Sequence, residues 1–362
     1  MARDHYLPAS FIGRFSNDYY PGTRSRDHVV WAGYLGSNQP VQQKASSLGY
    51  GKGLYDLHSE FETAPMTDSI DSWKYEKELP RVLDTLCSGE RLSLSDWLHV
   101  AVPFVAGQFV RGPEFNERYK DRLSDLWPTL SENCKRIGYT GNVINFARVI
   151  EMQSFLLPVM AARWKVIHAV GGCRFILNDM GMTPIFDIAE QGPGWAIPLD
   201  TRTVLFLVPK LQRCFGTYGR DGRWHALVEY LDEPDIFFND FNKLTANTSQ
   251  RFIVGSDPNT IERLLPLISK KTPQQLRAYR DSGWQAKRGI ATASDDCIMW
   301  GAAADIADND IPPGRLKDYK TSAHHVNANR WAPLFLALQE YSDMGNGRLA
   351  FFGNNLIIKQ TA

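Results

Sequence analysis

The chain has 362 residues, of which 43% are hydrophobic and 22% are charged, and its 40 Lys and Arg residues balance its 40 Asp and Glu residues. This is the composition of a globular protein that is long enough for one large domain or for a main domain with a smaller one. A net charge of zero argues against a protein that coats nucleic acid non-specifically, because that mode of binding needs a basic face.

The cysteines and the apolar segments narrow the protein class further. The five cysteines are dispersed and form no C-x-x-C pair, so neither a zinc knuckle nor a disulfide framework is expected. The N-terminus has no basic segment followed by an apolar one, as a signal peptide would. No apolar run approaches the roughly 20 residues that span a bilayer. We therefore expect a cytoplasmic protein that does not bind membranes.

The first predicted element is an apolar N-terminal segment. His5, Tyr6, Phe11, Ile12 and Phe15 all occur there, although chain termini are usually polar and loose. Two interpretations follow: the segment docks into the core, or it delivers His5 to a site that the rest of the chain builds. Histidine suits acid–base chemistry near neutral pH. A lone histidine beside an apolar cluster is, however, more often structural.

Helices are predicted from about residue 68 to residue 170, because apolar residues recur there at helical spacing. The expected helices are one from a cap at Asp68 or Ser69 to about Leu86, one from a cap at Ser93 or Ser95 to about Arg111, and one over about 142–169. Pro103 and Pro158 should kink the second and third helices, and Gly112-Pro113 should end the second.

After residue 170 the pattern changes to short apolar runs separated by Gly, Pro and Asp, which is typical of buried strands. Strands are expected at 173–177, 195–199, 203–208, 223–231 and 251–255, one or two more within 17–53, helices at 235–247 and 258–268, and a β-hairpin at 348–360. The predicted class is α+β. A helical half with long kinked helices is followed by a modest mixed or antiparallel sheet, and the N-terminal segment docks on the core. Residues 1–268 should form the main domain, and residues 269–362 a C-terminal extension packed on it.

The helix around residues 104–111 carries the first candidate polar site. Phe104, Gln108 and Arg111 fall on one face of this helix. A Gln and an Arg beside an apolar stripe are costly to bury without partners, and the guanidinium of Arg matches a carboxylate or a phosphate. The alternative is that Arg111 pairs with a structural carboxylate while Gln108 caps a loop.

The second candidate site is Asn178-Asp179, at the end of the predicted strand 173–177. Carboxylates at strand ends are well placed for chemistry, because the strand is rigid and the following loop is open. The alternative is an Asx-turn in which Asp179 binds its own loop.

These segments occur in an order that resembles the domain-of-unknown-function family 4238. Its members look like H-Y-V-P at the start, F-x-x-x-Q-x-x-R-x-P in a helix, a strand ending in S/T-D-x-P, and then P-L-S-P. This chain has H-Y-L-P, F-V-A-G-Q-F-V-R-G-P, F-I-L-N-D and P-L-D-T in that order. The resemblance covers roughly residues 4–268. It brings no settled activity, so it supplies positions rather than a reaction.

Carried over by position, the resemblance implies site residues at His5, Tyr6, Pro8, Gln108, Arg111 and Asp179. The chain departs from the family at two places. The proline that follows the aspartate is displaced to Pro184, so the turn after Asp179 differs. Asp200 stands where the family has a serine and would add a second carboxylate.

We expect a hydrolase or nuclease-like enzyme that acts on an anionic substrate. This substrate would be a phosphodiester or a nucleotide, either as a small molecule or as part of a nucleic acid. His5 would transfer a proton, Asp179 would orient it or share a metal, and Arg111 with Gln108 would hold the substrate. The expected catalytic residues are His5, Gln108, Arg111 and Asp179, and the expected substrate-binding residues are Tyr6, Arg111, Asn178 and Asp200.

The sequence assigns no cofactor and no metal ligand, although a divalent metal is compatible with it. A version that depends on a divalent metal would use His5, Asp179 and either Asp200 or Glu76, a ligand set for Mg, Mn or Zn. The second hypothesis is a non-catalytic binding or interaction protein. In it the same polar residues form a structural network that ties the N-terminus to the core, and aromatic surfaces contact the partner.

Overall fold

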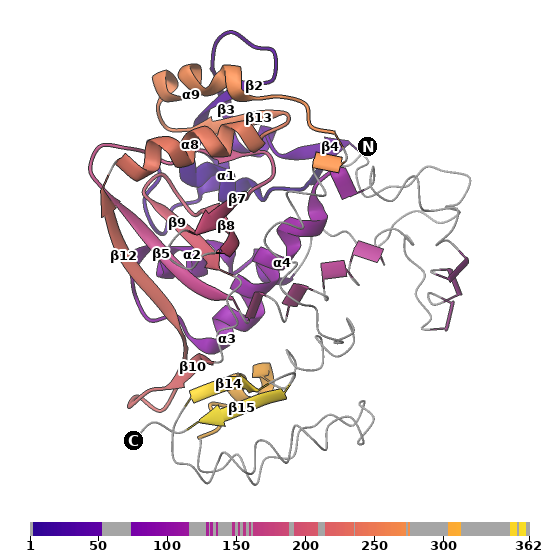
Figure 1. The fold of residues 1–362 in the computed structure, drawn as a ribbon, viewed down its shortest axis with the longest axis vertical. Helices are drawn as coiled ribbons and strands as arrows, with labels where there is room; N and C mark the ends of the chain where they lie inside the picture. Colours follow the sequence, from indigo (N-terminus) through magenta and orange to yellow (C-terminus); the bar gives the residue numbers. More distant parts are fainter. Residues whose placement is uncertain are drawn as a thin grey trace.

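The computed structural model contains helices together with mixed and antiparallel sheets, so the α+β class is confirmed (Figure 1). It describes residues 3–52, 74–115, 162–187, 192–208, 214–234, 236–272, 303–312, 348–352 and 355–359, with short stretches within 128–160 and at 274–275. The predicted cap at Asp68 or Ser69 and the predicted kink at Pro158 lie outside the described residues. Within them, no helix has both the length and the apolar character needed to cross a bilayer.

The helices are short, and most of them surround the sheets. Among the described residues, the named α-helices are α1 (Ala9–Ile12), α2 (Leu79–Ser88), α3 (Leu94–Asp96), α4 (Val102–Arg111), α8 (Ile236–Thr248) and α9 (Pro258–Leu264). A π-helical turn lies at Trp97–Ala101, and 3-10 turns lie at Gly13–Phe15, Ser25–Asp27, Ala45–Ser47, Lys74–Glu76 and Leu265–Leu267. Residues 303–308 are also helical. Figure 1 shows α8 and α9 at one end of the molecule.

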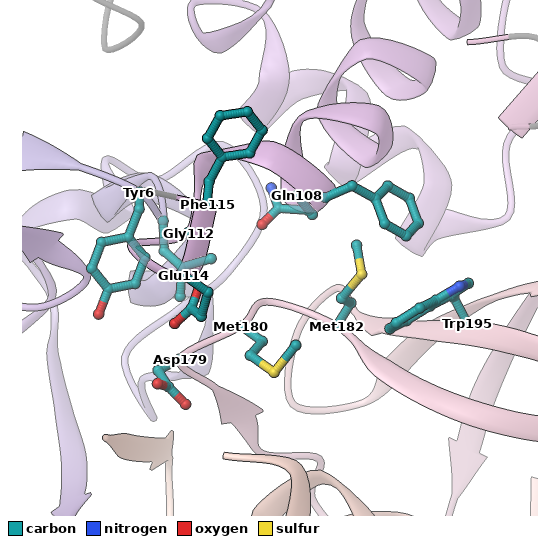
Figure 2. A pocket seen from close by; sticks show the side chains of 11 residues that line it. Tyr6, Gln108, Gly112, Glu114, Phe115, Asp179, Met180, Met182 and Trp195 are labelled. Carbon is teal, nitrogen blue, oxygen red and sulfur yellow. The ribbon is translucent and has the colours of Figure 1, made fainter. Parts of the chain in front are cut away.

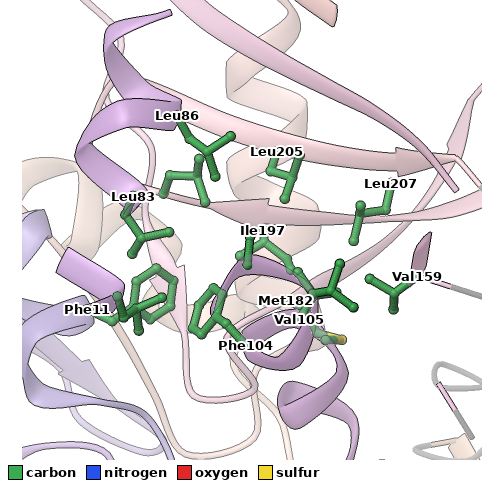
Figure 3. Packing of buried hydrophobic residues seen from close by; sticks show 14 of the residues in the cluster. Phe11, Leu83, Leu86, Phe104, Val105, Val159, Met182, Ile197, Leu205 and Leu207 are labelled. Atoms are coloured by element: carbon green, nitrogen blue, oxygen red, sulfur yellow. The ribbon is translucent and has the colours of Figure 1, made fainter. Parts of the chain in front are cut away.

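The central sheet has five strands, and only its β12–β5 pair is parallel. Its order is β12 (Val228–Pro234), β5 (Arg163–Val170), β9 (Thr203–Val208), β8 (Gly192–Pro198) and β7 (Thr183–Asp187). All six residues of β9 are buried, because both faces of the sheet are covered. Leu205 and Leu207 point toward α2 and α4 (Figure 3), whereas the ring of Phe206 lies 6.1 Å from that of Phe241 in α8. The predicted strand 203–208 is confirmed.

Three smaller sheets, all antiparallel, complete the described fold. They are β3 (Val41–Lys44), β2 (Val29–Tyr34), β13 (Phe252–Gly255) and β6 (Leu177–Asn178); β1 (Arg3–His5) with β4 (Tyr50–Lys52); and β11 (Trp224–Ala226), β10 (Cys214–Tyr218), β14 (Arg348–Phe352) and β15 (Asn355–Lys359). The last pair is the hairpin that the sequence predicted at 348–360.

Two of the predicted elements need correction. The third helix was expected to reach residue 169, but 163–170 form strand β5 in the centre of the sheet. The β-branched Val166 and Ile167 favour a strand, and hydrogen-bonded partners on both sides override the helical spacing of the apolar residues. The run 173–177 is a strand only at Leu177.

Pro103 acts differently from a mid-helix kink. Ser93 caps α3 as predicted, since its side chain accepts a hydrogen bond from the backbone of Asp96 at 3.0 Å. A π-helical turn follows, and Pro103 lies in the first turn of α4, where its missing N–H is tolerated. The helix then ends at Arg111, directly before Gly112, as predicted.

Part of the predicted C-terminal extension contacts the α3 region. The carboxylate of Asp308 accepts a hydrogen bond from Ser95 at 2.5 Å and lies 2.7 Å from the ring of His99. The indole of Trp224 donates to the backbone oxygen of Ile311 at 2.9 Å. Residues 303–312 are thereby attached to the rest of the described chain.

Candidate functional site

A pocket lies where the chain after β1, the end of α4, the turn after β6 and strand β8 meet (Figure 2). It is a narrow pocket, because the volume open to the centres of water-sized molecules is only about 40 Å³. The lining residues are Tyr6, Leu7, Gln108, Phe109, Gly112, Glu114, Phe115, Asp179, Met180, Met182 and Trp195. Figure 2 shows the oxygen atoms of Tyr6, Glu114 and Asp179 at one end of the pocket, and Met182 and Trp195 toward the other.

Asp179 is the predicted site residue that the structure places most clearly in this pocket. It follows strand β6 directly, and its backbone N–H donates to the oxygen of Phe252 in β13 at 3.1 Å. Its Oδ1 accepts hydrogen bonds from the Ser249 hydroxyl at 2.7 Å and from the Gln250 backbone at 3.0 Å. Its Oδ2 is buried and has no hydrogen-bond partner among the described residues. Asp179 is only 3% exposed, and one of its two carboxylate oxygens has hydrogen-bond partners among the described residues.

Burial and neighbouring charges act on both titratable groups at this end of the pocket. Burial raises the pKa of Asp179, while the hydrogen bonds from Gln250 and Ser249 and the charge of Arg251 lower it. Burial also raises the pKa of Tyr6, and the neighbouring carboxylates of Asp179 and Glu114 raise it further, whereas Arg251 lowers it. Arg251 and the buried Lys271 therefore place positive charge beside the Asp179 carboxylate.

Glu114 is a candidate site residue that the sequence analysis missed. It lies just beyond α4, three residues after Arg111, and its Oε1 accepts a hydrogen bond from the side chain of Gln250 at 3.2 Å. Gly112 leaves room for it, since a Cβ at that position would lie 2.1 Å from Oε2 of Glu114. The carboxylate directly after the Gly-Pro helix stop was the available sequence signal.

Gln108 lines the pocket from α4, as the predicted helix face implies. Its side-chain nitrogen donates to the backbone oxygen of Phe104 at 3.4 Å. Its Oε1 faces Gly181, where a Cβ would come within 2.5 Å of that oxygen and within 2.6 Å of Leu7. Gly181 also has a positive φ of 72°. Only glycine meets both conditions.

Arg111 lies behind the pocket wall and not among its lining residues. Its guanidinium forms an ion pair with Glu76 and donates to the Tyr75 hydroxyl at 3.2 Å and to the backbone oxygen of His5 at 2.7 Å. Burial raises the pKa of Glu76 while Arg111 lowers it. Arg111 thus has the structural carboxylate partner of the alternative interpretation.

The His5 side chain points to a different neighbourhood from that of Asp179. Its Nε2 lies 3.4 Å from the backbone oxygen of Ser46, and its ring centroid lies 5.8 Å from that of Tyr50 on β4. The ring is not one of the groups that line the pocket. Tyr6, the next residue, is the one that reaches the pocket.

Two predicted substrate-binding residues occupy buried polar networks elsewhere. The side-chain nitrogen of Asn178 donates to the Thr248 hydroxyl at 3.0 Å and to the backbone oxygen of Met182 at 3.1 Å, which ties α8 to the turn after β6. Asp200 lies 3.9 Å from the guanidinium of Arg14. The structure therefore does not bring Asp200 into the Asp179 pocket.

The structure does not bring together the residues of the metal-dependent alternative. Glu76 pairs with Arg111, and Asp200 lies beside Arg14. Across the part of the chain that the structure describes, no group of three or more His, Cys, Asp or Glu side chains could hold a metal ion. Any cation in this pocket would have to use fewer carboxylates and other oxygen ligands.

The pocket is the main evidence on function. No family model, no curated protein sequence and no solved structure matches the chain. The resemblance to the domain-of-unknown-function family 4238 stays a prediction, and the family of this chain is not identified by comparison.

Proposed function

We propose that the protein is a hydrolase and that its reaction takes place in the pocket around Asp179 and Glu114. The observation that carries the proposal is the buried Asp179 carboxyl, which lines the pocket with one oxygen that has no hydrogen-bond partner among the described residues. Buried polar groups normally have partners, and exceptions are frequent at functional sites. Two carboxyl groups at a pocket can orient and polarise an attacking water molecule.

In this proposal the N-terminal segment docks on the core and forms one wall of the pocket. The helical half of the chain and the sheet that follows it form the rest of the arrangement. Three contacts support it. The backbone N–H groups of Tyr6 and Leu7 both donate to the oxygen of Gly49, at 2.8 and 3.1 Å, and Arg111 binds the oxygen of His5. In this proposal Arg111 is a positioning residue that holds Tyr6 in the pocket wall.

The proposed substrate is a phosphodiester or a nucleotide, and the proposed location is the cytoplasm. The described residues that line the pocket include two carboxylates and neither Lys nor Arg. Like charges repel strongly in a partly buried site, so a phosphate group can approach two carboxylates only where positive charge offsets the repulsion. Arg251, which acts electrostatically on both Asp179 and Tyr6, is the described residue that would supply this charge.

Asp179→Asn is expected to lower the hydrolysis of bis(p-nitrophenyl) phosphate by about 100-fold or more without lowering the melting temperature. Asparagine has the same shape and its Oδ1 accepts the same two hydrogen bonds, while the ionised carboxyl that burial disfavours is removed. Release of nitrophenol and a thermal melt measure the two quantities. Asp232→Asn, at an exposed position on β12, is the matched control. Equal activity of wild type and Asp179→Asn would contradict the proposal.

A second candidate function is a binding protein without catalysis. It is favoured by the Arg111 ion pair and by the Asn178 network, in which two predicted site residues serve the fold. In that case the wild-type protein hydrolyses neither phosphodiester nor phosphomonoester probes. It nevertheless binds a nucleotide, and the Asp179→Asn variant binds that nucleotide more weakly.

His5→Gln is expected to change activity by less than about 3-fold, because the ring contacts Ser46 and Tyr50 and does not line the pocket. A change of that size corresponds to well under 1 kcal/mol. The measurement is the pH profile of hydrolysis for both proteins. If the variant keeps its melting temperature but loses its activity, the ring is the proton-transfer group that the sequence suggested.

A further inference from the structure

A second pocket lies beside helices α8 and α9, which Figure 1 shows next to each other. This α8–α9 pocket shares no lining residue with the Asp179 pocket and is far roomier. The volume open to the centres of water-sized molecules is about 490 Å³, against about 40 Å³ in the Asp179 pocket. Its lining includes Asn17, Arg174, Asn239, Asn242, Ser256 and Arg263. Small-molecule sites typically have volumes of about 300–1,000 Å³.

Hydrogen bonds between distant segments hold the walls of the α8–α9 pocket in place. The side chain of Asn17 donates to the backbone oxygen of Ser256 at 2.7 Å. Asn242 in α8 is 1% exposed, and its side chain donates to the backbone oxygen of Arg174 at 2.7 Å and accepts from the N–H of Ile176 at 3.2 Å. The pocket is therefore a fixed feature of the fold and not a gap between loops.

Two arginines face this pocket from different segments. Arg174 precedes strand β6, and its Nη1 donates to the backbone oxygens of Gly172 at 3.2 Å and of Cys173 at 3.1 Å, which orients the guanidinium. Arg263 lies on α9. Neither arginine forms an ion pair with a carboxylate among the described residues, and Nη2 of Arg174 has no hydrogen-bond partner among them. Donor groups therefore remain available to a ligand.

The charge of the described lining is positive on balance. Its one carboxylate is Asp257, on which Arg263 acts electrostatically. Both oxygens of this carboxylate are already used, because Oδ1 accepts from the N–H of Asn259 at 3.3 Å and Oδ2 from the N–H and the hydroxyl of Thr260 at 2.9 and 2.6 Å. Two guanidinium groups against one such carboxylate favour an anionic ligand. A phosphate group carries up to two charges and matches the planar donor fork of arginine.

The room around Arg263 continues into a neighbouring pocket of about 430 Å³. Asn239 and Arg263 line both pockets, and the second one is completed by Lys243, Leu264 and Leu267. Lys243 already pairs with the exposed Asp240 at 2.9 Å. Beyond the arginines there is thus space for the organic part of a ligand, with an amide and two leucines beside it.

We propose that the α8–α9 pocket binds a small organic phosphate. The phosphate group lies between Arg174 and Arg263. The organic part extends past Asn239 toward Leu264 and Leu267. Because this site shares no residue with the Asp179 pocket, the inference does not depend on the proposed function.

The test is calorimetric titration with AMP, glucose 6-phosphate and phenyl phosphate, and with their phosphate-free parents adenosine, glucose and phenol. We expect at least one of the phosphates to bind at a single site, and its parent to bind about tenfold more weakly or worse. Arg174→Gln and Arg263→Gln should each weaken the phosphate by the same factor. Arg263 is exposed, so its variant should keep the wild-type melting temperature. Arg220→Gln, at an exposed position in the turn between β10 and β11, is the matched control and should bind normally.

Three results overturn the inference: no saturable binding of any of the three phosphates to the wild type, equal affinity for a phosphate and its parent, or unchanged affinity in Arg263→Gln. The same titrations in Asp179→Asn separate this inference from the proposed function. If binding is lost in Asp179→Asn but kept in Arg263→Gln, the ligand occupies the Asp179 pocket and the inference falls. If binding is unchanged in Asp179→Asn while the wild type hydrolyses no probe, the α8–α9 site stands and the proposed function falls.

Discussion

Arg111→Ala is expected to destabilise the protein by about 3–5 kcal/mol, the usual result of removing one partner from a buried ion pair. The Arg111 side chain is 1% exposed and is paired with Glu76. Alanine would leave this carboxylate without its counter-charge. It would also remove the donor to the His5 oxygen, which is one of the contacts that hold the N-terminal segment. Urea unfolding followed by circular dichroism measures the loss.

Arg81→Ala is the matched control for this experiment. Its guanidinium forms an equally direct ion pair with Asp96 at 2.6 Å, but the Arg81 side chain is 54% exposed. Exposed pairs contribute at most about 1 kcal/mol. If Arg111→Ala unfolds at the wild-type urea concentration and instead loses its activity, Arg111 binds the substrate, as the first sequence hypothesis states.

Phe11→Ala is expected to cost about 3–5 kcal/mol, the range for truncating a fully buried aromatic side chain. The Phe11 side chain is 0% exposed. Its ring meets Phe104 edge-on at 5.1 Å and Phe15 at 6.1 Å. The substitution would leave a cavity between α1 and α4 at the level shown in Figure 3. The free energy of unfolding in urea is again the measurement.

Tyr20→Ala is the control for the N-terminal region, because this aromatic side chain is 67% exposed and its loss should cost less than about 0.5 kcal/mol. A cost below 1 kcal/mol for Phe11→Ala would show that the first residues contribute little to the core. It would also remove the support for a docked N-terminal wall.

The elements that the sequence predicted well are those in which the local pattern agrees with the burial. Strand 203–208 is apolar at nearly every position, and it is covered on both faces. The stop of α4 at Gly112 and the cap at Ser93 depend only on neighbouring residues. The prediction for residues 163–170 was wrong for the opposite reason, because there the local pattern does not decide between helix and strand. The apolar residues of this segment fit a helix equally well, and only its pairing with β9 and β12 decides the structure.

The candidate site also contains residues that the sequence predicted and residues that only the tertiary structure shows. The sequence analysis placed Asp179 at the end of a strand and Gln108 on a helix face, and both line the pocket. The position of Glu114 directly after the Gly-Pro helix stop marked it in the sequence, but its place beside Asp179 depends on Gln250, more than 130 residues further along the chain. The sequence analysis could not separate Arg111 from the pocket, since the partner Glu76 has no fixed spacing from it in the sequence.

The sequence by itself determined the α+β class, the limits of several strands and helix ends, and the residue types that could perform chemistry. These features follow from hydrophobic periodicity and from capping and turn residues, which act over a few positions. Only the tertiary structure decided which polar groups share a pocket and which pair with other residues inside the fold. The reason is that a buried charge takes its partner from whichever segment folds next to it, as Arg111 does with Glu76 and Asp179 does with Gln250.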